Sequence, residues 1–100
     1  MAFLFEFEWD SVKAQSNVSK HGLDFEGAAT VFLDPLALTI PDEEHGDIEA
    51  RWVTIGRDAT ARYVVVVHTF EQLTTQGGRI RLISARRPTK KEVYNYEEQL

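Results

Sequence analysis

Four arginines gather in one short stretch of this sequence, and their chemistry suits phosphate. Arg79, Arg81, Arg86 and Arg87 lie within residues 79–87, a stretch whose composition is typical of a β-strand. The planar arginine guanidinium donates paired hydrogen bonds that match a phosphate group. Nucleic acid is therefore the first partner to consider, although the chain carries a formal net charge of −5 at pH 7.

The net charge hides a strong segregation along the chain. Residues 1–50 contain 2 Lys against 11 Asp and Glu, a net charge of −9, whereas residues 51–100 contain 9 Lys and Arg against 5 Asp and Glu, a net charge of +4. An overall acidic protein thus contains a basic half, in which the arginine-rich strand lies.

Strand alternation singles out Arg86 among these arginines. A strict period of two places it with Ile80, Leu82 and Ser84, and turns Arg79, Arg81 and Arg87 to the opposite face. An arginine on a mostly apolar face needs a partner, and we expect a phosphate. An ion pair with Glu92 or Glu26 is the structural alternative. The other arginines, with Lys90 and Lys91, could track phosphates or form a basic edge that deters strand pairing.

His21 is the natural candidate for proton transfer, since histidine titrates near neutral pH. It follows Lys20 directly, and Lys20 could bind phosphate. Both precede Gly22, where a helix is expected to end, and positive charge is favoured there by the helix dipole. A purely structural His21 and a solvated Lys20 therefore stay open as alternatives.

The elements that must position these side chains follow from periodicity and capping signals. Alternating aromatic residues predict a strand over Phe3–Trp9, and Asp10, Asp24 and Thr89 are the expected caps of three helices. The predicted helices are Ser11–His21, Phe25–Leu33 and one from Thr89 through Tyr96. The further predicted strands are Leu36–Ile40, Arg51–Arg57, Arg62–Phe70 and Arg79–Arg87.

This order predicts one α+β domain over residues 1–100, with helices packed on a small antiparallel sheet. Gly77 and Gly78 are expected to form a turn, and the connection over residues 71–78 is expected to be long and mobile. The acidic loop Pro41–Asp47 is expected to be solvated and to hold no metal, and His68 to be a structural histidine. There is no cysteine, which fits a reducing cytosol, and the apolar start is too short for a signal peptide or membrane span.

Several motifs resemble, in order, those of the BrnT toxins. They are Phe7-Glu8-Trp9-Asp10, Lys13, Asn17, Lys20-His21-Gly22, Phe25-Glu26, Ala28, Phe32-Leu33-Asp34-Pro35, Arg51, Ile55-Gly56, Ile83-Ser84-Ala85-Arg86, Glu92 and Tyr96. The resemblance implies a RelE-like fold, a cytoplasmic location and a metal-independent endoribonuclease without a cofactor. It also implies neutralisation by a ribbon-helix-helix antitoxin, BrnA, in a heterotetramer built on the antitoxin dimer, with DNA bound only through the antitoxin.

Metal-independent RNA cleavage by the ribose 2′-hydroxyl needs a base, an acid and cations at the phosphate. With the resemblance in view, the expected catalytic residues are His21, Arg57, Arg86 and Tyr96. The expected substrate-binding residues are Lys20, Arg51, Arg79 and Arg81. A non-catalytic module that docks an antitoxin-like protein through the same basic face is the alternative. Direct DNA binding is disfavoured by the acidic first half and the lack of a helix-turn-helix pattern.

Overall fold

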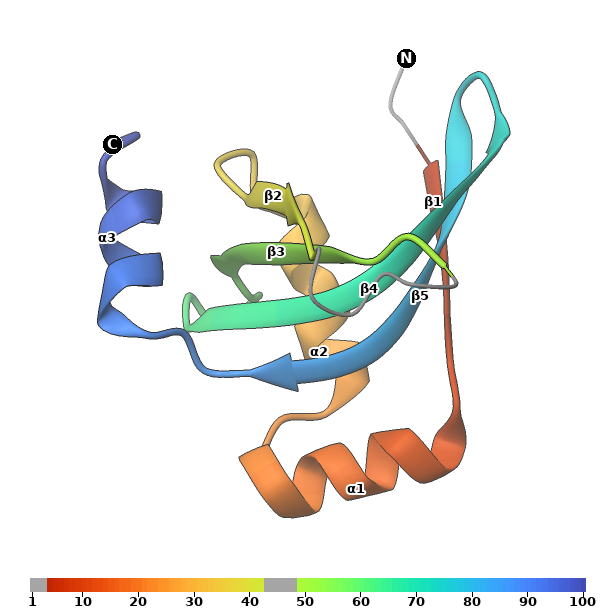
Figure 1. Ribbon diagram of the computed structural model, residues 1–100, viewed down its shortest axis with the longest axis horizontal. Coiled ribbons are helices and arrows are strands. Elements are labelled where there is room, and N and C mark those ends of the chain that lie inside the picture. The colour runs from red at the N-terminus through yellow and green to blue at the C-terminus, as the bar shows by residue number, and fades with distance from the viewer. Residues whose placement is uncertain (1–3, 43–48) are drawn as a thin grey trace.

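The computed structural model describes residues 4–42 and 49–100 (Figure 1). The predicted α+β layout is confirmed. In chain order the elements are β1 (Leu4–Trp9), α1 (Ser11–His21), α2 (Phe25–Ala29), the 3₁₀ helix η1 (Thr30–Leu33), β2 (Leu38–Pro41), β3 (Trp52–Arg57), β4 (Tyr63–Thr74), β5 (Gly77–Arg86) and α3 (Lys90–Glu97). Of the predicted acidic loop only Pro41 and Asp42 belong to the described residues. None of the described helices is long and apolar enough to cross a membrane.

The strands form one sheet in the order β1-β5-β4-β3-β2. The pairs β2–β3, β3–β4 and β4–β5 are antiparallel, as predicted, but β1 runs parallel to β5. This pairing corrects the expectation of a wholly antiparallel sheet. A tight turn fixes the direction of a hairpin partner, whereas β1 reaches β5 only through all the intervening elements.

The helices begin where their capping residues predict. Asp10 Oδ1 accepts hydrogen bonds from the Val12 and Lys13 amides at 2.8 and 3.0 Å, and α1 ends at Gly22, whose φ is 68°. Asp24 caps α2 through the Gly27 amide at 2.6 Å. The single helix predicted over Phe25–Leu33 is instead α2 followed by η1.

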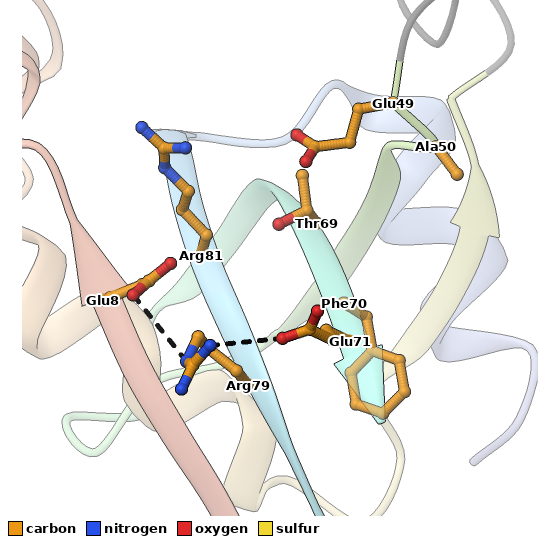
Figure 2. A pocket seen from close by; sticks show the side chains of 8 residues that line it. All are labelled: Glu8, Glu49, Ala50, Thr69, Phe70, Glu71, Arg79 and Arg81. Carbon is orange, nitrogen blue, oxygen red and sulfur yellow. Dashed lines mark hydrogen bonds and ion pairs between the residues drawn. The ribbon is translucent and has the colours of Figure 1, made fainter. Parts of the chain in front are cut away.

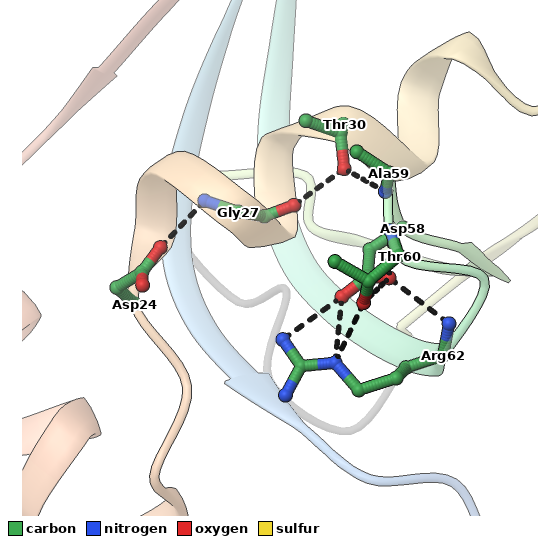
Figure 3. Close-up of polar contacts among 7 residues, drawn as sticks. All are labelled: Asp24, Gly27, Thr30, Asp58, Ala59, Thr60 and Arg62. Carbon is green, nitrogen blue, oxygen red and sulfur yellow. Dashed lines mark hydrogen bonds and ion pairs between the residues drawn. The ribbon is translucent and has the colours of Figure 1, made fainter.

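The change from α to 3₁₀ geometry falls at Thr30, whose hydroxyl serves two partners (Figure 3). It donates to the Gly27 carbonyl at 2.6 Å and accepts the Ala59 amide at 2.8 Å. A threonine that bonds back to the preceding turn competes with the regular helical ladder. The same contact ties η1 to the β3–β4 turn, in which buried Asp58 binds Thr60 and Arg62.

Two apolar clusters lie on opposite faces of the sheet. The larger packs α2, η1 and parts of α1 on Val64, Val66, Ile80 and Leu82. The smaller packs Tyr96 of α3 on Ile55 and Val65. Since neighbouring residues of a strand point to opposite faces, Val64 and Val65 place α1 and α3 on opposite sides.

His68 is a satisfied structural histidine, as predicted. It is buried in β4, with Nε2 2.7 Å from the Thr54 hydroxyl and Nδ1 3.1 Å from the Thr69 carbonyl oxygen. Burial lowers the pKa of His68, and the contact with Thr69 opposes that shift only in part. The imidazole is therefore neutral in the fold at neutral pH.

The β4–β5 hairpin corrects the prediction of a long connection over residues 71–78. β4 continues to Thr74, a turn occupies residues 75–76, and β5 begins at Gly77. Gly77 and Gly78 thus belong to the strand and not to the turn. Glycine is needed at both positions because close neighbours leave no room for a side chain. A Cβ at Gly77 would lie 2.7 Å from the Leu4 carbonyl oxygen, and one at Gly78 would lie 2.6 Å from a ring carbon of Phe70.

Candidate functional site

A β-bulge at Ile83 decides which way the arginines of β5 point. Leu82 pairs with His68 and Ser84 pairs with Val67, so Ile83 is an extra residue without a partner of its own. The alternation shifts phase at this residue. Arg86, paired with Val65, therefore shares a face with Arg79 and Arg81, contrary to the predicted arrangement.

The face that carries these arginines contains a cleft of about 320 Å³ beside α3. Arg51 of the segment before β3 and Arg86 of β5 both line this cleft, and the chain brings them together from positions far apart in sequence. The remaining lining residues are Asp42, Val53, Val67, Ile83 and Ser84. Two arginines among the lining residues, beside apolar Val53, Val67 and Ile83, make this cleft the candidate anion-binding site.

Arg86 forms a bidentate ion pair with Glu92 of α3. Its Nη1 and Nη2 donate to Glu92 Oε1 and Oε2 at 2.9 and 3.0 Å. The hydrogen bonds from Arg86 hold the pKa of Glu92 below its usual value, against the effect of burial, and those to Glu92 raise the pKa of Arg86. Glu92 also closes a capping box with Thr89, the residue expected to cap this helix. The ion pair with Glu92, which was the structural alternative for Arg86, is thus present.

Arg51 and Asp42 complete the cleft. The Asp42 amide donates to the Arg51 carbonyl at 2.9 Å, so the backbone fixes the two residues side by side. The half-buried Arg51 side chain has no hydrogen-bond or ion-pair partner among the described residues. The negative charge of Asp42 adds to the rise in the pKa of Arg86. Asp42 was expected only as part of a solvated loop, and its place in the cleft could not be read from its neighbours in sequence.

The other predicted arginines of β5 lie at the far end of this face, around a second cavity of about 410 Å³ (Figure 2). Arg79 lies 3.5, 3.8 and 3.2 Å from carboxylate oxygens of Glu6, Glu8 and Glu71. Three carboxylates around one guanidinium leave this end net negative. Arg81 is exposed on the same strand, and within residues 4–42 and 49–100 it has no ion-pair partner.

Tyr96 belongs to α3, and its side chain is buried between this helix and the sheet. Its side chain is 2% exposed, and its hydroxyl donates to Asp34 Oδ2 at 2.6 Å. Burial and the Asp34 carboxylate raise the pKa of Tyr96 to about 12. Burial alone would raise the pKa of Asp34, but hydrogen bonds from Tyr96 and from the Arg57 and Leu36 amides outweigh it and lower that pKa.

Arg57 is exposed beside this tyrosine and lies at the end of β3. Its Nη2 donates to the Tyr63 hydroxyl at 3.0 Å, and the Tyr63 hydroxyl donates to Glu97 at 2.7 Å. The guanidinium carbon lies 5.0 Å from the Tyr63 ring centre and 6.0 Å from that of Tyr96. Arg57 and Tyr96 thus form a second group at α3, and neither lines the cleft with Arg51 and Arg86.

Lys20 and His21 are exposed at the end of α1. Helix α1 packs on the opposite face of the sheet from α3, and neither residue lines the cleft. The buried residue of this helix is Asn17, which binds the strand that carries Arg86. Its amide nitrogen donates to the Leu23 and Ala85 carbonyls, each at 2.9 Å, and its oxygen accepts the Ala85 amide at 3.0 Å. An asparagine in mid-helix, where it is a poor helix former, was the available signal.

No cluster of three or more His, Asp and Glu side chains within the described ranges could hold a metal ion. What the fold and the cleft define is a small α+β protein in which two arginines, Arg51 and Arg86, line one cleft on a face of the sheet, a place where an anion could bind.

The family model described as "Ribonuclease toxin, BrnT, of type II toxin-antitoxin system" matches residues 9–92. The chain belongs to this family and is an endoribonuclease toxin, with RNA as substrate and an antitoxin as partner. Among solved structures it is similar to the Brucella abortus ribonuclease toxin BrnT, with a TM-score of 0.58 and 24% sequence identity over 87% of this chain and 99% of that one. That likeness supports the fold. The search of curated proteins found no match.

Proposed function

We propose that this protein cleaves RNA without a metal ion, with the scissile phosphate bound in the cleft between Arg51 and Arg86. The observation that carries the proposal is that Arg51 and Arg86 line one cleft on this face of the sheet. They lie far apart in sequence, and a shared phosphate would give Arg51 a partner of opposite charge and Arg86 a second one besides Glu92.

In the proposed reaction the ribose 2′-oxygen attacks phosphorus and the bond from phosphorus to the 5′-oxygen breaks. A base accepts the 2′-hydroxyl proton and an acid supplies a proton to the departing 5′-oxygen. The products carry a 2′,3′-cyclic phosphate and a 5′-hydroxyl. Arg51 and Arg86 would stabilise the negative charge that builds on the phosphorus oxygens.

For the proton transfers the proposal names His21, from the resemblance in sequence. Asp42 is the carboxylate that lines the cleft itself, so it is the residue to compare with His21. Arg57 and Tyr96 are proposed to act at the leaving-group side, and buried Tyr96 would do so through its contact with Arg57. Lys20, Arg79 and Arg81 are proposed to contact RNA outside the cleft.

The antitoxin is proposed to be a ribbon-helix-helix protein of the BrnA type. Its dimer would bind two copies of this chain and would make all contacts with DNA. The proposal places the pair in the cytoplasm. Size-exclusion chromatography with light scattering on the co-expressed pair measures the stoichiometry.

The test is cleavage of a long single-stranded RNA in EDTA by wild type, Arg86→Ala, Arg51→Ala, His21→Ala and Asp42→Asn. Arg62→Ala is the matched control, since it removes the same charge from the β3–β4 turn (Figure 3), and Arg62 does not line the cleft. Circular dichroism checks that each variant is folded.

The proposal expects metal-free cleavage that the two cleft arginine variants lose and Arg62→Ala keeps. Of His21→Ala and Asp42→Asn, the variant that loses one limb of the pH–rate profile identifies the proton-transfer group. Cleavage that survives both arginine changes would reject the cleft as the site. Absence of cleavage by folded, antitoxin-free wild type across several RNAs would favour a module that only binds its partner.

A further inference from the structure

The guanidinium of Arg86 is held by one edge and free on the other. Its end edge, Nη1 and Nη2, donates to Glu92, and Nη1 also donates to the Arg87 carbonyl at 3.3 Å. The Nε hydrogen and the second Nη2 hydrogen have no partner among the described residues. These two hydrogens point the same way and form a second fork, with the spacing that suits two oxygens of one phosphate.

Glu92 is itself held in place at the start of α3. Its Oε1 accepts the Thr89 amide at 2.8 Å, and its own amide donates to the Thr89 hydroxyl at 3.2 Å. One carboxylate therefore accepts hydrogen bonds from the helix cap and from Arg86 at the same time. A carboxylate with both oxygens engaged has little freedom to rotate, so the guanidinium it holds is also fixed in orientation.

We propose, resting on the function proposed above, that Glu92 is a positioning residue. It holds Arg86 so that the free Nε–Nη2 edge donates two hydrogen bonds to one RNA phosphate in the cleft. Glu92 acts through Arg86 and does not touch the RNA.

The pair has a second consequence, because its net charge is zero. Arg86 then contributes oriented hydrogen bonds rather than net charge, while Arg51 and Asp42 bring one positive and one negative charge to the cleft. Replacing Glu92 by glutamine removes one negative charge, so the net charge of the pair rises from zero to +1. It also sets an amide NH₂ group against Nη2 of Arg86, which breaks one of the two hydrogen bonds and releases the guanidinium. Binding and cleavage should therefore respond in opposite directions.

The experiment compares wild type with Glu92→Gln, Arg86→Lys and Thr89→Ala. Each is assayed for kcat and KM on a labelled RNA, and for binding of the same sequence made with 2′-O-methyl ribose, which cannot be cleaved by 2′-hydroxyl attack. Binding is titrated over a range of salt concentrations. Thr89→Ala is the matched control, since it weakens the helix cap but leaves the Arg86–Glu92 pair.

For Glu92→Gln we expect kcat to fall at least about tenfold, while binding at low salt is unchanged or tighter. Its log–log salt slope should steepen by about 0.7, the value for one more phosphate neutralised on a single strand. Arg86→Lys keeps the charge but loses the fork, so we expect weaker binding and no rescue of kcat. Thr89→Ala should lose stability and keep the wild-type kcat.

Wild-type kcat in Glu92→Gln or in Arg86→Lys would overturn the positioning role, and so would an equal loss of kcat in Thr89→Ala. If wild type cleaves no RNA, the methylated RNA still decides: the predicted binding pattern would keep the fork and reject cleavage. Uniform binding by wild type, Glu92→Gln and Arg86→Lys would reject the fork.

Discussion

Replacing Asn17 by alanine tests how the fold supports the strand that carries Arg86. Beyond Trp9, β1 no longer pairs with β5, and the side-chain amide of Asn17 takes the place of a strand partner at Ala85. The change to alanine removes three hydrogen bonds, two to Ala85 and one to Leu23. The Leu23 carbonyl and the Ala85 carbonyl and amide then lose these hydrogen bonds, and no other described side chain replaces Asn17.

The expected loss can be worked from these contacts. A buried hydrogen bond contributes about 1 kcal/mol net, so three give about 3 kcal/mol. A domain of this size is stable by about 5–15 kcal/mol, so the variant should still fold. The melting temperature should fall by roughly 12–24 °C, at about 4–8 °C for each kcal/mol.

Urea denaturation followed by circular dichroism measures the free energy of unfolding. Asn95→Ala is the matched control: Asn95 is exposed on α3, and its change should stay within about 0.5 kcal/mol. A loss below about 1 kcal/mol in Asn17→Ala would refute the idea that this amide replaces a strand partner.

Asn17→Asp adds a test of sign. An ionised carboxylate would still accept from the Ala85 amide but would face two carbonyl oxygens, so its pKa in the fold should lie above the unfolded value. The folded state then binds more protons, so the stability of Asn17→Asp relative to wild type should rise as the pH falls from 7 toward 4. A stability difference from wild type that does not change over this range would contradict the buried geometry.

Three further changes test other parts of the structure by denaturation. Ala61→Gly should stabilise by about 0.5 kcal/mol, because Ala61 has φ 67° in the β3–β4 turn, whereas Ala59→Gly should not stabilise; equal effects would count against strain at Ala61. His68→Gln should flatten the pH dependence: wild type loses stability as the pH falls below about 6.5, since burial lowers the His68 pKa and the unfolded chain binds the proton more tightly. An unchanged slope would reject that assignment. Tyr96→Phe should cost about 1.5–3 kcal/mol at pH 7, the range for a hydrogen bond to a charged group. This difference should shrink as the pH falls below the ordinary Asp34 value of 3.8 and Asp34 takes up a proton, and a difference that persists there would contradict it.

Helix starts could be predicted because their signals are local. Asp10, Asp24 and Thr89 each bind amides within three residues, so the sequence next to them contains the necessary information. The same holds for the structural role of Glu92 in the capping box. The change to 3₁₀ geometry at Thr30 was missed because it depends partly on Ala59, which is remote in sequence.

The face of Arg86 could not be predicted, because a bulge belongs to two strands at once. Nothing in the residues around Ile83 shows that Val67 and His68 pair on either side of it. The direction of β1 and the burial of Tyr96 depend likewise on distant partners. Of the predicted site, Arg51 and Arg86 line one cleft, while His21, Arg57 and Tyr96 lie elsewhere, and their catalytic roles stay predictions.

The parallel pairing of β1 with β5 also sets an order of events during synthesis. Glu6 and its partner Arg79 are 73 residues apart, and a ribosome adds that length in roughly 4–15 s. Until then the aromatic residues of β1 have no strand to pair with. Arg86 and Glu92 are added later still. A growing chain therefore cannot form the proposed phosphate fork until residue 92 has been synthesised. On the proposed function, the nascent chain therefore cannot cleave RNA until these residues have been added.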